Sequence, residues 1–147
     1  MKKSLIVVFS FLVFASTSNY GAQAADSIVK LTVSAIGAHE PSGGALKGGA
    51  WGTFLLNRTK GIVCSTIKTK DLTNITGSHI HAGVRGVTSE IVVTIDAQRF
   101  NISGENCVKA PISLVRAMTA NPSSYYFNVH TTTFPGGAVR GQLARRK

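Results

Sequence analysis

Apolar and polar residues alternate with a period of two along most of the chain, and this pattern constrains the fold more than any other feature. Between residues 29 and 35, valine, leucine and alanine alternate with lysine, threonine and serine. Successive side chains of a strand point to opposite faces, so such a segment forms a strand with one buried and one solvated face. We predict seven strands, at residues 29–35, 50–56, 61–68, 76–82, 90–95, 124–131 and 137–143.

Turn residues separate these strands, and one helical segment interrupts them. Residues 57–61 lie between two apolar runs and predict a hairpin loop. Aliphatic residues and a methionine recur at helical spacing between Pro111 and Pro122, which predicts a short helix packed on the core. Many short strands with one short helix predict an all-β fold, either an antiparallel β-sandwich or a Greek-key barrel.

The N-terminal segment has the features of a secretory signal peptide. Two lysines precede an apolar run from Leu5 to Ala15, and the small residues of Ala22-Gln23-Ala24 suit a signal peptidase. The run is shorter than the ~20 residues that span a bilayer; an uncleaved anchor is the alternative. We therefore expect a signal peptide at residues 1–24, a domain at residues 25–147, and a secreted or periplasmic product that does not span a membrane.

The two cysteines, Cys64 and Cys107, both lie in the expected mature domain. Two cysteines in an oxidising compartment can form a single disulfide. A pair of free thiols in a metal or redox site is the alternative, but the wide separation of the two residues differs from the C-x-x-C spacing of such sites. We therefore predict the disulfide.

The charge of the chain bears on its partners. Sixteen lysine and arginine residues outnumber six acidic residues, and the net charge is +10. This charge attracts anionic envelopes, polysaccharides or lipid head groups. The basic residues are mostly scattered singly, which argues against nucleic acid, and the acids offer no obvious pair for glycoside hydrolysis. We expect an unidentified, anionic envelope or extracellular partner and no nucleic acid.

Three histidines fall on the polar sides of predicted strands. His79 and His81 are two residues apart and therefore share a face, and His130 lies on the polar side of a later strand. Neutral imidazole suits copper and zinc, so the three are candidate ligands of one metal ion. The alternative is that they are ordinary outward residues or hydrogen-bond to adjacent loops. The same outer polar face is predicted to carry Asn128, Arg140 and Gln142.

Two stretches resemble the CHRD domain, a module first described in chordin and also found alone in exported microbial proteins. One is His79-Ile80-His81. The other runs from Tyr125 to Leu143 and contains Tyr-Tyr-x-Asn-Val-His-Thr, Phe-Pro-Gly-Gly and Val-Arg-Gly-Gln-Leu. The similarity extends from about Ser27 to Leu143. It departs from the family at Ala138, where a glutamate is usual, so this chain lacks that acid at position 138.

The resemblance implies an immunoglobulin-like β-barrel and a secreted or envelope location, but no activity. The family is also distantly similar to copper/zinc superoxide dismutases. The resemblance therefore implies that His79, His81 and His130 follow the order of three copper ligands in those enzymes, and that Arg140 takes the place of the catalytic arginine. A dismutase of that type also needs a bridging histidine and a zinc subsite. Only His39 remains, which is too few residues for a binuclear site.

Two hypotheses follow from the sequence. The favoured one is an exported, non-catalytic binding or structural module, because the chain has no complete active site. The other is a mononuclear copper or zinc protein with superoxide dismutase-like site chemistry, in which Arg140 steers small anions toward the metal.

Overall fold

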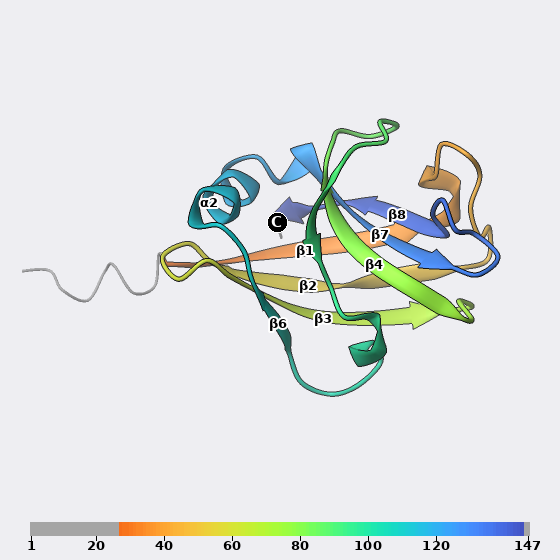
Figure 1. The fold of residues 1–147 in the computed structure, drawn as a ribbon, viewed down its shortest axis with the longest axis horizontal. Helices are drawn as coiled ribbons and strands as arrows, with labels where there is room; N and C mark the ends of the chain where they lie inside the picture. Colours follow the sequence, from red (N-terminus) through yellow and green to blue (C-terminus); the bar gives the residue numbers. More distant parts are fainter. Residues whose placement is uncertain (1–26, 146–147) are drawn as a thin grey trace, which may run out of the picture.

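A computed structural model describes residues 27–145 and shows antiparallel strands arranged as a nearly closed barrel (Figure 1). The predicted signal peptide, residues 1–24, lies outside the described residues. The strands are β1 (Ile28–Ile36), β2 (Gly49–Asn57), β3 (Ile62–Lys70), β4 (Ile75–Ala82), β5 (Ile91–Thr94), β6 (Asn106–Lys109), β7 (Tyr125–Thr131), β8 (Val139–Gln142) and β9 (Ala144–Arg145). The helices are α2 (Ile112–Ala120) and the short 3-10 helices Gly37–His39, Ala97–Arg99 and Pro122–Ser124.

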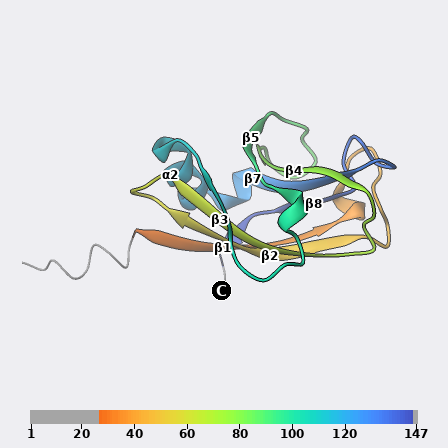
Figure 2. The ribbon, with the colours of Figure 1, turned by 60° about the horizontal axis from the view of Figure 1, so that its bottom comes forward.

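The strands form two layers. Their order in the sheet is β5-β4-β7-β8-β1-β2-β3-β6, with β9 paired to β1. In Figure 2 the strands β1, β2 and β3 form one layer, and β4, β7 and β8 lie across the core from them. The prediction of an all-β antiparallel sandwich or barrel with one short helix is confirmed. Within residues 27–145, no helix is both long and apolar enough to cross a membrane.

All seven predicted strands are present, and two further strands were missed. β6 has four residues and β9 has two. Both are held by pairing with strands that are distant in the sequence: β6 pairs with β3, and β9 pairs with β1. Such long-range pairing leaves no local signal in the sequence.

The predicted hairpin between β2 and β3 is confirmed. Asn57 lies opposite Ile62 at the end of the ladder. The Asn57 Oδ1 atom accepts hydrogen bonds from the main-chain nitrogens of Thr59 (3.1 Å) and Lys60 (2.9 Å). Gly61 closes the turn at a φ of 64°, a left-handed conformation that glycine adopts without strain.

The core lies between the two layers and is closed at one end by α2. The rings of Phe54 and Phe127 meet edge to face across the layers, with centroids 5.5 Å apart. Val115 and Met118 of α2 are fully buried in the same core, which confirms the predicted packing of the helix. Ile112, the first residue of the helix, is 42% exposed instead.

The predicted disulfide is present and ties β6 to β3. Cys64 and Cys107 lie directly opposite each other in the ladder, and their sulfurs are bonded. The bonded sulfurs do not offer thiolates to a metal. The bond closes a long loop, because the two residues are 43 positions apart.

Replacing both cysteines, as Cys64→Ala/Cys107→Ala, should lower the free energy of unfolding by about 4 kcal/mol, because the unfolded chain regains the entropy lost on closing a loop of about 44 residues. Urea denaturation followed by circular dichroism measures the change. Wild-type protein treated with a reducing agent should show a similar loss. Equal unfolding midpoints for oxidised wild type and the double variant would contradict the expectation.

Candidate metal centre

The pairing of β4 with β7 brings the three histidines together. His79 lies opposite Asn128, and Gly77 lies opposite His130. Residues that are opposite or two apart share a face, so the three rings stand together on the side away from the core. Their centroids are 5.7 Å apart for His79 and His81, 5.1 Å for His79 and His130, and 6.5 Å for His81 and His130.

The cluster has nearly the dimensions of a single-ion site. One ring nitrogen from each histidine lies within 4.8 Å of the others. Nitrogen ligands of a tetrahedral zinc ion stand about 3.3 Å apart, given bonds of about 2.0–2.1 Å. The predicted side chains therefore do come together, with nitrogen separations of up to 4.8 Å against about 3.3 Å in a bound site.

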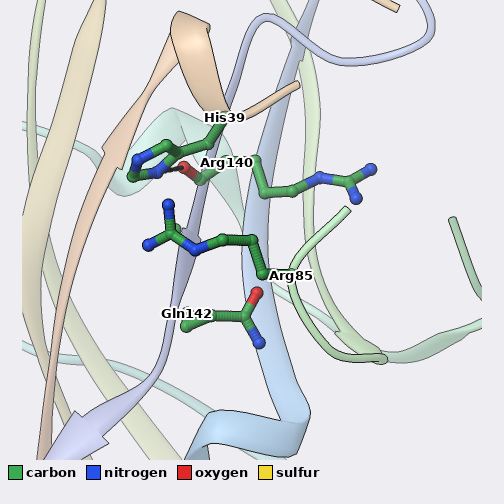
Figure 3. Close-up of a pocket in the computed structure, with 5 residues that line it drawn as sticks. His39, Arg85, Arg140 and Gln142 are labelled. Carbon is green, nitrogen blue, oxygen red and sulfur yellow. Dashed lines mark hydrogen bonds between the residues drawn. The ribbon is translucent and has the colours of Figure 1, made fainter. Parts of the chain in front are cut away.

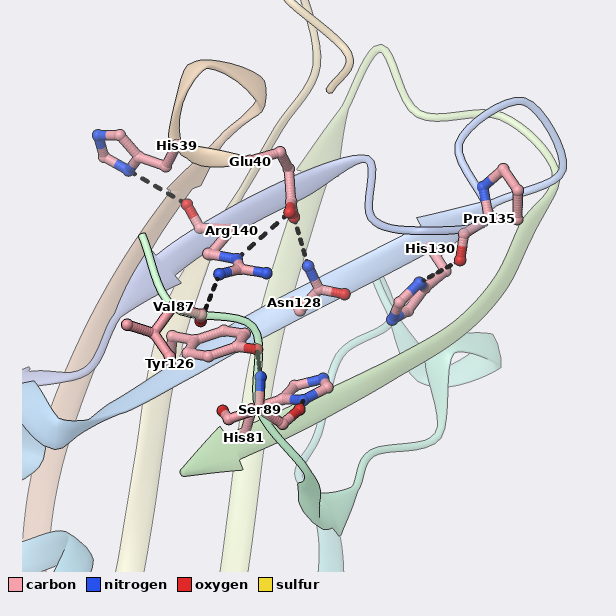
Figure 4. Close-up of polar contacts among 10 residues, drawn as sticks. All are labelled: His39, Glu40, His81, Val87, Ser89, Tyr126, Asn128, His130, Pro135 and Arg140. Carbon is pink, nitrogen blue, oxygen red and sulfur yellow. Dashed lines mark hydrogen bonds and ion pairs between the residues drawn. The ribbon is translucent and has the colours of Figure 1, made fainter. Parts of the chain in front are cut away.

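Main-chain carbonyls orient two of the three rings. His81 Nδ1 is 2.8 Å from the Ser89 carbonyl oxygen, and His130 Nδ1 is 2.9 Å from the Pro135 carbonyl oxygen (Figure 4). A carbonyl oxygen only accepts, so each Nδ1 must carry the proton and donate it. In the neutral ring the lone pair is then on Nε2, the arrangement that metal-binding histidines commonly have.

The nitrogens left over are buried and have no hydrogen-bond partner in the protein. They are the Nε2 atoms of His81 and His130 and the Nδ1 atom of His79. A buried polar atom without a partner costs about 1–3 kcal/mol, so native proteins rarely leave several in one place. Three such atoms in one cluster fit the donor set of a bound metal ion.

The electrostatic environment favours the neutral form of two of these rings. Burial lowers the pKa of His79 below its ordinary value of 6.5, and His130 and His81 lower it further. Burial also lowers the pKa of His81, where His130 and Arg140 act in the same direction and the hydrogen bond to Ser89 opposes them. The unprotonated imidazole is the form that binds metals.

The polar side of these strands is covered, which corrects the prediction of an outer polar face. His81 is 8% exposed, Asn128 is 1% exposed and Arg140 is 4% exposed. The loops that follow β1 and β4 fold over them. Gln142 is half-buried, and its Nε2 atom lies 3.0 Å from the Gly83 carbonyl oxygen in the second of these loops. Strand alternation indicates which side a residue takes, but it does not show whether a loop covers that side.

Arg140 is engaged in a buried ion pair. Its Nε atom is 3.3 Å from Glu40 Oε2, and one terminal nitrogen donates to the Val87 carbonyl oxygen at 2.9 Å (Figure 4). Its guanidinium carbon stands 4.0 Å from the centroid of the Tyr126 ring. Asn128 Nδ2 donates to the other carboxylate oxygen of Glu40. The hypothesis that Arg140 steers anions toward a metal is therefore wrong, because its guanidinium is buried and occupied.

Glu40 is a site residue that sequence reasoning missed. Burial raises the pKa of its carboxyl group, although Arg140, His130 and Asn128 all act to lower it. The backbone leaves room for this carboxylate at Gly137, where an added Cβ would stand 2.6 Å from its carbon and from one of its oxygens. The available signal was Ala138, two residues before Arg140, where the resemblance to the family implies a glutamate. The loop after β1 supplies the carboxylate instead.

Tyr126 connects the ion pair to the histidine cluster. Its ring is stacked on His81, with centroids 4.7 Å apart and planes 4° from parallel, and Arg140 lies over it as well. His81 is on β4 and Arg140 is on β8. β7 runs between these two strands, so Tyr126 of β7 lies between His81 and Arg140. The Tyr126 hydroxyl accepts a hydrogen bond from the main-chain nitrogen of Ser89 at 3.3 Å. Tyr126 thus supports both His81 and the loop that orients it.

The fourth histidine does not extend the cluster. His39 Nδ1 lies 3.2 Å from the main-chain oxygen of Arg140. Figure 3 shows the recess that His39, Arg85 and Gln142 line, with the Arg140 side chain directed away from His39. His39 therefore contacts the backbone behind the ion pair and does not join the metal-ligand candidates.

A cleft includes one histidine of the cluster in its lining. It has a volume of about 500 Å³ and includes His79 in its lining, together with Ser78, Thr94, Asp96 and Gln98. His81 and His130 do not line this cleft.

Comparison with known proteins identifies the family. The model of the CHRD domain matches residues 31–143, which include both histidine-bearing strands and the C-terminal motif. The chain belongs to the CHRD domain family. Neither the curated proteins nor the solved structures contain a match. The distant similarity to copper/zinc superoxide dismutases is therefore not supported by these comparisons.

Arg140→Met should lower the free energy of unfolding by about 3–5 kcal/mol, because it leaves the Glu40 carboxylate buried without its cation. Urea denaturation measures the loss. The double variant Glu40→Gln/Arg140→Met removes both charges and should recover part of it. The exposed Arg85 lines the neighbouring recess, and Arg85→Met should change stability by no more than about 0.5 kcal/mol. Wild-type stability in Arg140→Met would contradict the buried ion pair.

Proposed function

We propose that this CHRD-domain chain is an exported module that binds one copper or zinc ion through His79, His81 and His130. The observation that carries the proposal is the convergence of three imidazoles, two of which are oriented by main-chain carbonyls so that their Nε2 lone pairs are free. The alternative that these histidines bind adjacent loops accounts for one nitrogen of His81 and of His130. It does not account for the buried nitrogens on the other side of each ring.

The donor set favours copper or zinc. Both metals accept neutral imidazole, and three histidines with an open fourth position are a known arrangement for zinc. Among residues 27–145, the cluster that contains these histidines includes no thiolate or carboxylate. A bound ion would supply a Lewis-acidic centre with a position left for water or another ligand.

A binding role is better supported than catalysis of the superoxide dismutase type. Arg140, which would have to attract the anionic substrate, is buried against Glu40. His39, the remaining histidine, is directed to a main-chain oxygen and not to a second metal. We therefore propose metal binding without assigning a reaction.

Export forms part of the proposal. A signal peptide at residues 1–24 would release a domain of residues 25–147 into the periplasm or the extracellular space. The Cys64–Cys107 disulfide supports this location, because disulfides form and persist mainly in oxidising compartments.

Calorimetric titration of the purified, metal-free chain with Cu(II) or Zn(II) should show one ion bound per chain with a micromolar or lower dissociation constant. Removing one of three ligands, in His81→Ala or in His130→Ala, should weaken binding by at least about 100-fold. His39→Ala is the matched control and should retain wild-type affinity, because His39 lies outside the cluster.

Circular dichroism should show that each variant keeps the fold, and His130→Ala gives a second test if the more deeply buried His81 is needed for stability. Unchanged affinity in both folded variants would contradict the proposed site. The absence of any histidine-dependent binding in the wild-type chain would do so as well.

A further inference from the structure

The outer side of β1, β2 and β3 is a surface that lies apart from the histidine cluster. Figure 2 shows this layer at one side of the molecule, with α2 and the strands of the second layer on its inner side. The side chains on its outer side alternate with the core residues of the same strands. We call this surface, centred on Trp51 of β2, the Trp51 face. It includes Lys30, Thr32, Ser34, Trp51, Thr53, Thr66, Lys68 and Lys70.

Trp51 is an exposed aromatic side chain in the middle of a sheet. It is 44% exposed and lies directly between Ser34 of β1 and Lys68 of β3. Gly49 shares the same side of β2, and a Cβ added there would stand 3.9 Å from Cζ3 of the indole. The six-membered ring of Trp51 therefore lies along the strand beside Gly49. This position leaves part of the indole open to a ligand.

The cations of this surface outnumber its acidic neighbours, which are Asp71 beside Lys70 and Glu105 beside the Cys64–Cys107 disulfide. Lys30, Lys68 and Lys70 are all exposed on it, and Lys68 is the direct cross-strand neighbour of Trp51. β1, β2 and β3 contain no aspartate or glutamate. Among residues 27–145, Asp71 at the end of β3 forms the one ion pair with these lysines, at 4.0 Å from Lys70. The Trp51 face is thus a positively charged surface.

Hydroxyl groups complete the surface. Thr32, Thr53 and Thr66 lie opposite one another in a row across the three strands, next to the row that contains Trp51. A surface with an aromatic ring, lysines and hydroxyls can stack on the apolar face of a sugar ring, pair with its carboxylates and hydrogen-bond to its hydroxyls. The same side also carries the exposed Ile28 and Ile36 at the two ends of β1. A bilayer is still a poorer fit, because lysines, serine and threonines separate these residues, whereas membrane-surface binding usually uses a continuous apolar face that enters the lipid.

We infer that the Trp51 face binds an acidic polysaccharide that carries carboxylate groups. The sugar chain would lie across the strands, with one ring on Trp51 and its carboxylates near Lys68 and Lys70. Charge complementarity identifies the class of partner, and the exposed indole distinguishes a sugar chain from a simple anion. This inference does not depend on the metal site, because the two surfaces share no residue.

Trp51 is the only tryptophan of the chain, so its fluorescence reports directly on this surface. Titration of the purified chain with alginate oligosaccharides at low salt should change the tryptophan emission and saturate. Neutral dextran should leave the emission unchanged. Raising the salt concentration should weaken binding, because the lysine–carboxylate contacts are exposed and are screened.

Variants measured by calorimetry separate this surface from nonspecific attraction. Trp51→Ala should weaken alginate binding at least tenfold, and Lys68→Gln should weaken it several-fold and reduce its salt dependence. The matched controls are Leu46→Ala, which removes an exposed apolar side chain elsewhere, and Lys60→Gln, which removes an exposed lysine from the hairpin loop. Both controls should bind as the wild type does.

Three outcomes would overturn the inference. The first is that alginate does not bind saturably. The second is that Trp51→Ala and Lys68→Gln both bind alginate as tightly as the wild type does. The third is that the chain binds phosphatidylglycerol vesicles but not alginate. The last result would assign the surface to a membrane. His81→Ala should bind alginate normally, so failure of the metal site and failure of this inference can be distinguished.

Discussion

The antiparallel register between β4 and β7 is the constraint on which the candidate site depends. It places Gly77 opposite His130 and His79 opposite Asn128, so the three imidazoles stand on one side of the sheet. A slip of one residue would turn every side chain of β4 to the other face and move Ile80 out of the core. The buried apolar residues of β4 and β7 therefore fix the positions of the histidines, although they take no part in metal chemistry.

The buried ion pair extends this constraint to the loops. Glu40 comes from the loop after β1, and Arg140 also binds Val87 in the loop after β4. The second loop supplies the Ser89 carbonyl that orients His81, and Tyr126 lies between the pair and that ring. Because a buried charge is costly without its partner, the pair favours one arrangement of both loops. The conformation of the site and the stability of the fold are therefore linked.

Much of this arrangement could be predicted from the sequence, because strand alternation is a local property. It identified seven strands, and it put His79, His81 and His130 on the polar sides of theirs. It could not show that β4 and β7 are neighbours, nor that loops bury Asn128 and Arg140. Glu40 was missed for the same reason: it is 100 positions from Arg140, and only tertiary packing brings the two together. The short strand β6 likewise depends on its pairing with β3.

The central claim is that main-chain carbonyls hold His81 and His130 with their Nε2 lone pairs free for one metal ion. Long-range ¹H–¹⁵N correlation spectra of the ¹⁵N-labelled chain test it most directly, because they identify the protonated nitrogen of each ring. In the metal-free chain we expect the Nδ1–H form of both rings, and added Zn(II) should shift the Nε2 resonances of both. An Nε2–H form in both metal-free rings, or zinc binding that leaves the Nε2 resonances unmoved, would contradict the account.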